Sequence, residues 1–103
     1  NLASDRRLVI GDVVLDYDSY TVTKKNEVIE LPQKEFQLLY KLLSYPNKIF
    51  TRIQLMDEIW GMDYDGDIRT VDSHVARLRT KLGEWGNKNI VTVYGTGYKV
   101  NKN

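Results

Sequence analysis

The sequence contains no cysteine and only one histidine. Without cysteine the chain can form no disulfide bond and offers no thiolate nucleophile, which suits a reducing cytoplasm. The single histidine, His74, has no cysteine or second histidine with which to complete a zinc site. No apolar run exceeds a few residues and no leader peptide is recognisable, so we expect neither a membrane span nor secretion.

Motifs that carry chemistry are also scarce. The sequence has no glycine-rich phosphate loop and no pair of carboxylates in apolar surroundings. Asp63, Asp65 and Asp67 suggest the start of a calcium loop, but an EF-hand needs glycine at its sixth position and glutamate at its twelfth. Ile68 and His74 occupy those positions. We therefore expect no metal, no cofactor and no enzymatic activity.

The 103 residues are enough for one domain with its own core. Residues 1–7 are mostly polar and without periodicity, and the chain begins with Asn1 rather than methionine. We interpret residues 1–7 as the remnant of a linker in a longer protein, and we assign the domain to residues 8–103.

The net charge of +1 conceals an uneven distribution. Residues 1–68 carry 8 lysines and arginines against 12 acids, a net charge of −4, whereas residues 69–103 carry 7 against 2, a net charge of +5. A domain with a basic last third is suited to bind a polyanion through that third while the remainder is repelled.

Residues 8–31 contain four short runs rich in β-branched and aromatic residues, separated by turn signals. The runs cover residues 8–11, 13–18, 20–24 and 27–31. They predict a four-stranded antiparallel sheet with one packed face and one solvated face.

Two helices are predicted next. Pro32 favours a helix start, and the wide apolar stripe that follows it predicts a central, heavily buried helix. Thr51 and Gln54 have the spacing of a capping box for a second helix, which Gly61 ends.

A third helix is predicted over residues 69–82, with Gly83 at its end. Its apolar residues recur at helical spacing in one narrow stripe: Val71, Val75, Leu78 and Leu82. The opposite face carries cations and hydroxyl groups, and its only acid, Asp72, lies in the first turn, where the helix dipole favours negative charge. Such a helix packs one side into the core and offers the other to an anionic polymer, although charge alone also fits an ordinary solvated helix.

The chain ends in a hairpin signal. Residues 84–89 predict a turn, and the runs 90–93 and 98–100 bracket Gly95-Thr96-Gly97 as a β-hairpin. The order of four strands, three helices and a hairpin predicts an α+β winged helix-turn-helix fold, in which the hairpin is the wing.

A specific combination of short motifs extends over the predicted helices and hairpin. The motifs are Glu35-Phe36, Leu38-Leu39, Phe50-Thr51-Arg52, Leu55, Trp60-Gly61, Arg69-Thr70-Val71-Asp72, His74-Val75, Arg77-Leu78-Arg79, Val91, Val93 and Gly95-Thr96-Gly97-Tyr98. With these residues the chain resembles the winged-helix output domain of OmpR/PhoB-type bacterial response regulators. The predicted sheet fits the N-terminal sheet of that family, so the resemblance covers essentially the whole chain.

The resemblance implies sequence-specific binding to double-stranded DNA. The helix 69–82 would lie in the major groove, and the wing, residues 94–98, would reach the adjacent minor groove. The residues implied at base edges are Arg77, Ser73 and Asp72. Those implied near phosphates are Arg69, Thr70, His74, Arg79, Lys81, Arg52, Trp60, Thr96 and Tyr98, although for Tyr98 packing at the base of the wing is equally open.

Two positions depart from the family pattern. Ala76 stands where many members carry a second arginine, which removes one contact, although alanine can meet a thymine methyl group. Tyr94 stands where members often carry the arginine that enters the minor groove. We therefore expect little readout of the minor groove.

The resemblance also implies partners. It implies a cytoplasmic bacterial transcription regulator in a two-component system, with a receiver domain that is absent here and that a cognate histidine kinase phosphorylates. Two copies would occupy direct-repeat half-sites about one helical turn apart. For the loop with Asp63, Asp65 and Asp67 the resemblance implies contact with RNA polymerase, while its charge alone fits a solvated loop. An alternative function is a winged helix that binds only proteins, against which the cations of residues 69–82 argue.

Overall fold

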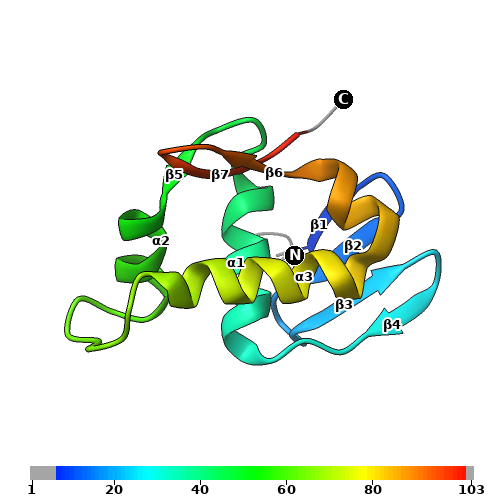
Figure 1. Cartoon of the computed structure of the whole chain (residues 1–103). Helices are drawn as coiled ribbons and strands as arrows, with labels where there is room; N and C mark the ends of the chain where they lie inside the picture. The colour runs from blue at the N-terminus through cyan, green and yellow to red at the C-terminus, as the bar shows by residue number, and fades with distance from the viewer. Residues whose placement is uncertain (1–6, 102–103) are drawn as a thin grey trace.

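The computed structural model describes residues 7–101 and has the predicted α+β winged helix-turn-helix architecture (Figure 1). In chain order the elements are β1 (Arg7–Ile10), β2 (Val13–Asp16), β3 (Thr21–Lys24), β4 (Glu27–Ile29), α1 (Gln33–Ser44), β5 (Phe50–Thr51), α2 (Arg52–Ile59), α3 (Arg69–Asn89), β6 (Ile90–Val93) and β7 (Gly97–Val100). Residues 1–6 of the expected linker lie outside the described residues. Arg7, which we also assigned to the linker, is the first residue of β1.

The N-terminal sheet is antiparallel throughout, with strand order β1-β2-β3-β4. Along β2, buried and less buried side chains alternate, as expected for a sheet that covers a core on one side only. Val13, Leu15 and Val22 are fully buried on the inner face, and Leu15 lies opposite Val22 in the register. This packed face is placed against α1, so the sheet closes one side of the core.

Helix α1 is the centre of the domain and crosses behind α3 in Figure 1. The wide stripe predicted for it is buried: Phe36, Leu38, Leu39, Leu42 and Leu43. Pro32 precedes the helix as its N-cap residue, with the extended ψ of 153°, rather than as its first helical residue. Because α1 contacts both α2 and α3, it fixes the two helices relative to each other.

The predicted capping box of α2 is confirmed. The Thr51 hydroxyl accepts a hydrogen bond from Gln54 N at 3.1 Å, and the Gln54 side chain accepts one from Thr51 N at 2.8 Å. Helix α2 ends at Ile59, with Trp60 as its C-cap, and the loop that leads to α3 follows directly.

The prediction of a turn at residues 84–89 is wrong. Gly83 takes a left-handed φ of 63° and interrupts α3, but a short helical segment resumes after it and continues to Asn89. Trp85 in this segment packs against the core, and its carbonyl accepts a hydrogen bond from the Asn89 side chain at 2.9 Å. Lys24 Nζ donates to the carbonyl of Leu82 at 2.9 Å, where the first part of the helix ends. The packing of Trp85 against the core and the hydrogen bond from Lys24 come from distant segments, so the local composition did not reveal them.

The C-terminal hairpin belongs to a three-stranded sheet of order β5-β7-β6. The two-residue strand β5 was not predicted. Its Thr51 lies opposite Gly97 of β7, and a Cβ atom on Gly97 would stand 1.9 Å from the carbonyl oxygen of Phe50. Glycine at this position therefore lets the wing approach the start of α2.

No helix in the described part of the chain combines the length and the apolar character needed to cross a membrane.

Candidate nucleic-acid interface

Helix α3 has the two faces that its sequence predicts. Val71, Val75, Leu78 and Leu82 are fully buried in the core. On the opposite side Ser73 and Arg77 are exposed, and 60% of the Arg77 side chain is accessible to solvent. A helix anchored along its full inner stripe presents these groups on a rigid support.

The start of α3 is held by Asp67. One oxygen of its carboxylate accepts a hydrogen bond from Arg69 N at 2.9 Å, and the other accepts from the Arg69 guanidinium at 2.8 Å. These hydrogen bonds lower the pKa of Asp67 below its ordinary value. Asp67 therefore caps the helix and orients Arg69, whose side chain stays largely exposed.

Asp72 joins three elements. Its carboxylate accepts a hydrogen bond from Arg52 Nη1 of α2 at 3.0 Å and a second one from the Tyr98 hydroxyl of β7. The aspartate thus links the first turn of α3 to both α2 and the wing. Both oxygens therefore accept hydrogen bonds within the domain.

Tyr98 is buried, with only 6% of its surface exposed. The physical reason is packing: Tyr98 lies in the core cluster, and its hydroxyl is directed to Asp72. Its ring lies 5.7 Å from the Arg79 guanidinium carbon. Of the two roles left open for Tyr98, the structure supports packing at the base of the wing.

The surroundings of Tyr98 predict that its phenol loses its proton only at high pH. Burial, then the hydrogen bond to Asp72 and the negative charge of that carboxylate, raise its pKa from 10.0 to about 12. Because the folded pKa exceeds the unfolded one, the contribution of Tyr98 to stability is complete below pH 10 and is lost as the pH rises through 12. In a spectrophotometric titration of tyrosinate, Tyr98→Phe is expected to remove a phenol that ionises near pH 12. Removal of an early-titrating phenol would contradict this arrangement.

Arg79 holds the wing to α3. Its guanidinium donates to the carbonyl of Ile90 at 2.9 Å and to the hydroxyl of Thr92 at 2.7 Å, both in β6. The family resemblance implied a phosphate contact for Arg79, and nothing in the sequence indicated its partners in β6. In the free domain the group is used within the fold.

Glu35 was missed as part of the site. It is a carboxylate of α1 with 1% exposure, and its oxygens lie 3.3 Å from Lys81 Nζ and 3.8 Å from the Arg77 guanidinium. An acid inside the apolar stripe of a predicted buried helix was the available signal, since a buried charge needs a partner. Glu35 draws these two side chains of α3 towards α1.

His74 and Trp60 form a contact between α2 and α3. Their rings meet edge to face, with centroids 4.9 Å apart. His74 Nδ1 lies 2.9 Å from the carbonyl of Thr70, and because a carbonyl only accepts, Nδ1 carries the proton. Both residues are half-buried, so a phosphate would meet only their edges.

The wing ends in an exposed turn. Thr96 N donates to the carbonyl of Val93 at 2.9 Å, and 92% of Tyr94 is exposed. A hollow of about 200 Å³ separates this turn from α3, lined by Arg52, Asp72, Thr92 and residues 93–98. The exposed residues of the turn, Tyr94, Gly95 and Thr96, line this hollow together with Arg52 of α2 and Asp72 of α3.

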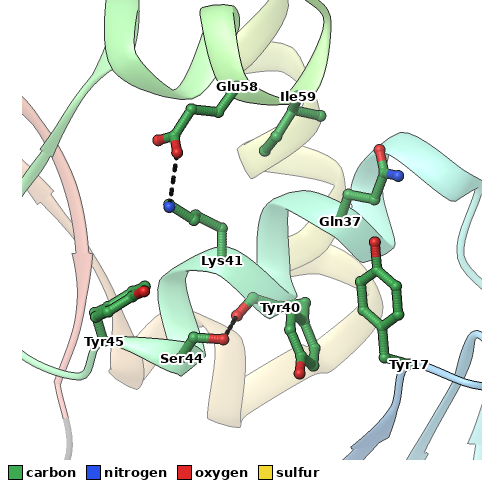
Figure 2. A pocket seen from close by; sticks show the side chains of 8 residues that line it. All are labelled: Tyr17, Gln37, Tyr40, Lys41, Ser44, Tyr45, Glu58 and Ile59. Carbon is green, nitrogen blue, oxygen red and sulfur yellow. Dashed lines mark hydrogen bonds and ion pairs between the residues drawn. The ribbon is translucent and has the colours of Figure 1, made fainter. Parts of the chain in front are cut away.

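A larger hollow, of about 500 Å³, lies between α1 and α2 (Figure 2). Lys41 and Glu58 form an ion pair of 2.7 Å across it. None of its lining residues belongs to α3 or to the wing, so it is separate from the surface described above. Among residues 7–101 no group of three or more histidine, cysteine or acidic side chains is arranged to hold a metal ion.

Comparison with known proteins places this fold among transcription regulators. A family model described as "Transcriptional regulatory protein, C terminal" matches residues 25–100. The chain is 44% identical over 101 residues to the heme response regulator HssR of Staphylococcus epidermidis, a match that covers 97% of this chain and 45% of that protein. The chain therefore spans less than half the length of this curated relative.

Solved structures agree with the sequence match. The response regulator DrrB of Thermotoga maritima, described as an OmpR/PhoB homolog, superposes with a TM-score of 0.83 at 31% identity, over 92% of this chain and 44% of that one. The DNA-binding domain of the response regulator AdeR, solved in complex with an intercistronic region, superposes with a TM-score of 0.81 at 32% identity, over 92% of this chain and 99% of that domain.

Proposed function

Because this chain belongs to the family of C-terminal domains of transcriptional regulatory proteins, of the OmpR/PhoB type, we propose that the outer face of α3 reads the major groove of its DNA site. The domain binds double-stranded DNA in the control of transcription. The observation that carries our proposal for α3 is its division into a fully buried stripe and an exposed face with Arg77 and Ser73.

Arg77 is the principal reader in this proposal. A guanidinium bonds O6 and N7 of one guanine together, which discriminates between bases by about 1–3 kcal/mol. Ser73 lies one turn earlier on the same face, and its small side chain lets the helix approach the bases closely. Asp72 takes a positioning role instead: its bonds to Arg52 and Tyr98 support a fixed distance between α3 and the wing.

The phosphate contacts lie around these readers. Arg69 and Thr70 are at the start of α3, where the helix dipole also attracts an anion. Arg52 and Thr96 both line the hollow beneath the wing, which suits the phosphate backbone between the two grooves. The wing tip carries Tyr94 rather than a cation, so we assign it contact with sugar and groove wall. His74, Lys81 and Trp60 complete the surface at its edges.

The remainder of the protein is inferred from its relatives. We propose that this domain follows a receiver domain which a cognate histidine kinase phosphorylates, in the cytoplasm of a bacterium. Pairs of such domains would occupy direct-repeat half-sites, about one helical turn apart. The longer curated relative supports a protein of this size.

The acidic loop before α3 separates into two parts. Asp67 caps α3, whereas Asp63 and Asp65 are exposed and make none of the contacts that hold α3. We propose that Asp63 and Asp65 face RNA polymerase.

The double change of Asp63 and Asp65 to asparagine, in the full-length regulator, is expected to lower transcription from a promoter bearing its site while DNA affinity stays the same. Asp67→Ala is the control in the same loop: it removes the cap of α3 and the hydrogen bonds to Arg69, so it is expected to weaken DNA binding itself. Unchanged transcription with the double variant would remove the polymerase contact.

DNA binding is tested by fluorescence anisotropy. The probes are a random duplex and a duplex selected from a random library by the protein itself, each measured from low to physiological salt. We expect a steep salt dependence, because cationic side chains displace counterions, and a preference for the selected duplex on the order of 10³-fold. Absence of binding at low salt would favour a winged helix that binds only proteins.

A further inference from the structure

The outer face of α3 contains a shallow hollow of about 240 Å³, lined by Ala76, Arg77, Thr80 and Lys81. The hollow exists because Ala76 contributes only a methyl group at a position that faces outward. Thr80 lies one turn further along, and its hydroxyl donates to the carbonyl of Ala76 at 3.1 Å. The hydroxyl is thus satisfied within the helix, which leaves the γ-methyl group of Thr80 available to a ligand.

The walls of this hollow are aliphatic and its edges are cationic. Lys81 Nζ lies 3.3 Å from Glu35, and the Arg77 guanidinium lies 3.8 Å from the same carboxylate. Because Glu35 is buried in α1, it draws both charged ends to one side, and their stems flank the hollow. A ligand would meet methyl and methylene groups, with positive charge nearby.

We propose that this hollow receives the 5-methyl group of a thymine in the major groove, so that Ala76 and Thr80 determine specificity beside Arg77. The proposal rests on the proposed function, since it requires α3 to lie in the groove. Thymine is the base that presents an apolar group there, and alanine and threonine methyl groups are suited to contact it. Lys81, on one side of the hollow, suits a phosphate next to the base, and the residues of the hollow lie on the α3 face assigned to DNA.

The test replaces thymine by deoxyuridine, which lacks only the methyl group, one position at a time in the selected duplex. At one thymine in each half-site the affinity is expected to fall about three- to fivefold, the equivalent of one buried methyl group. At other thymines outside the contact the substitution is expected to have no effect.

Three variants assign that loss to the hollow. Thr80→Ser keeps the hydroxyl but removes the methyl group, and it is expected to reduce the difference between thymine and deoxyuridine, since only the Ala76 methyl group then remains in the hollow. Thr80→Val keeps a methyl group in the hollow and is expected to preserve the difference. Thr70→Ser makes the same chemical change on α3 outside the hollow, and the difference is expected to persist whatever the change does to overall affinity.

The outcomes distinguish this inference from the proposed function. Binding to the selected duplex with no loss at any deoxyuridine, or a loss that Thr80→Ser leaves intact, would overturn the thymine site while DNA binding stands. Failure to bind any duplex would overturn the proposed function and the thymine site with it.

Discussion

Arg77→Ala is expected to weaken binding to the selected duplex by a factor of roughly 5 to 150, with the loss concentrated at one base pair. The reason is that Arg77 is the long, cationic side chain on the central outer face of α3, and its side chain is 60% exposed. Affinity for random duplex should change much less. Anisotropy on a set of duplexes with single substitutions measures the effect at each position.

Arg69→Ala is the matched control for that experiment. Arg69 is also an arginine of α3, and 80% of its side chain is exposed. We assign it to phosphate, so its removal is expected to weaken all duplexes alike and to lower the salt slope by about 1. Lys81→Ala is a second control, because Arg77 and Lys81 both lie beside buried Glu35 and removal of either leaves that carboxylate with one cation fewer. An even loss across all sequences for both variants would contradict the assignment of Arg77 as reader.

Gly97→Ala is expected to destabilise the domain by about 3 kcal/mol or more, because the added Cβ meets backbone rather than a movable side chain. The nearest atom would be the Phe50 carbonyl oxygen at 1.9 Å, so β5 and β7 would have to separate. Chemical denaturation measures the loss. Thr96→Ala, at the adjacent exposed position of the same turn, is the control and is expected to change stability little.

The Gly97 variant also tests the attachment of the wing. Tyr98 follows directly in β7 and its hydroxyl binds Asp72, so displacement of β7 is expected to break this link to α3. Loss of DNA affinity under conditions where the domain remains folded would agree with this link. Retention of full stability would mean that β5 does not hold the wing.

Much of this architecture was predictable because its determinants are local. The buried stripe of α3, from Val71 to Leu82, follows from spacing alone. The capping box of Thr51 and Gln54 acts within four residues, and the turn at Gly95 is a short signal. In each of these cases the residues that determine the structure lie within one short segment of the sequence.

The rest depended on contacts between distant segments. Strand β5 has two residues and exists only because Gly97 comes close to it. Asp72 and Arg79 were correctly placed on α3, but their partners, Tyr98 and the carbonyl of Ile90, are set by the packing of the wing. A sequence pattern predicts the helix face on which a charged side chain lies, but the partner of that side chain depends on the tertiary structure.

The most direct test of the central claim is an NMR titration of the uniformly labelled domain with its selected duplex, with each amide followed separately. Our account predicts that the largest shifts occur in residues 69–81 and 94–98, with small shifts in β1 to β4 and at the hollow between α1 and α2. Largest shifts on the N-terminal sheet, with α3 and the wing unaffected, would contradict the claim that α3 is the recognition helix.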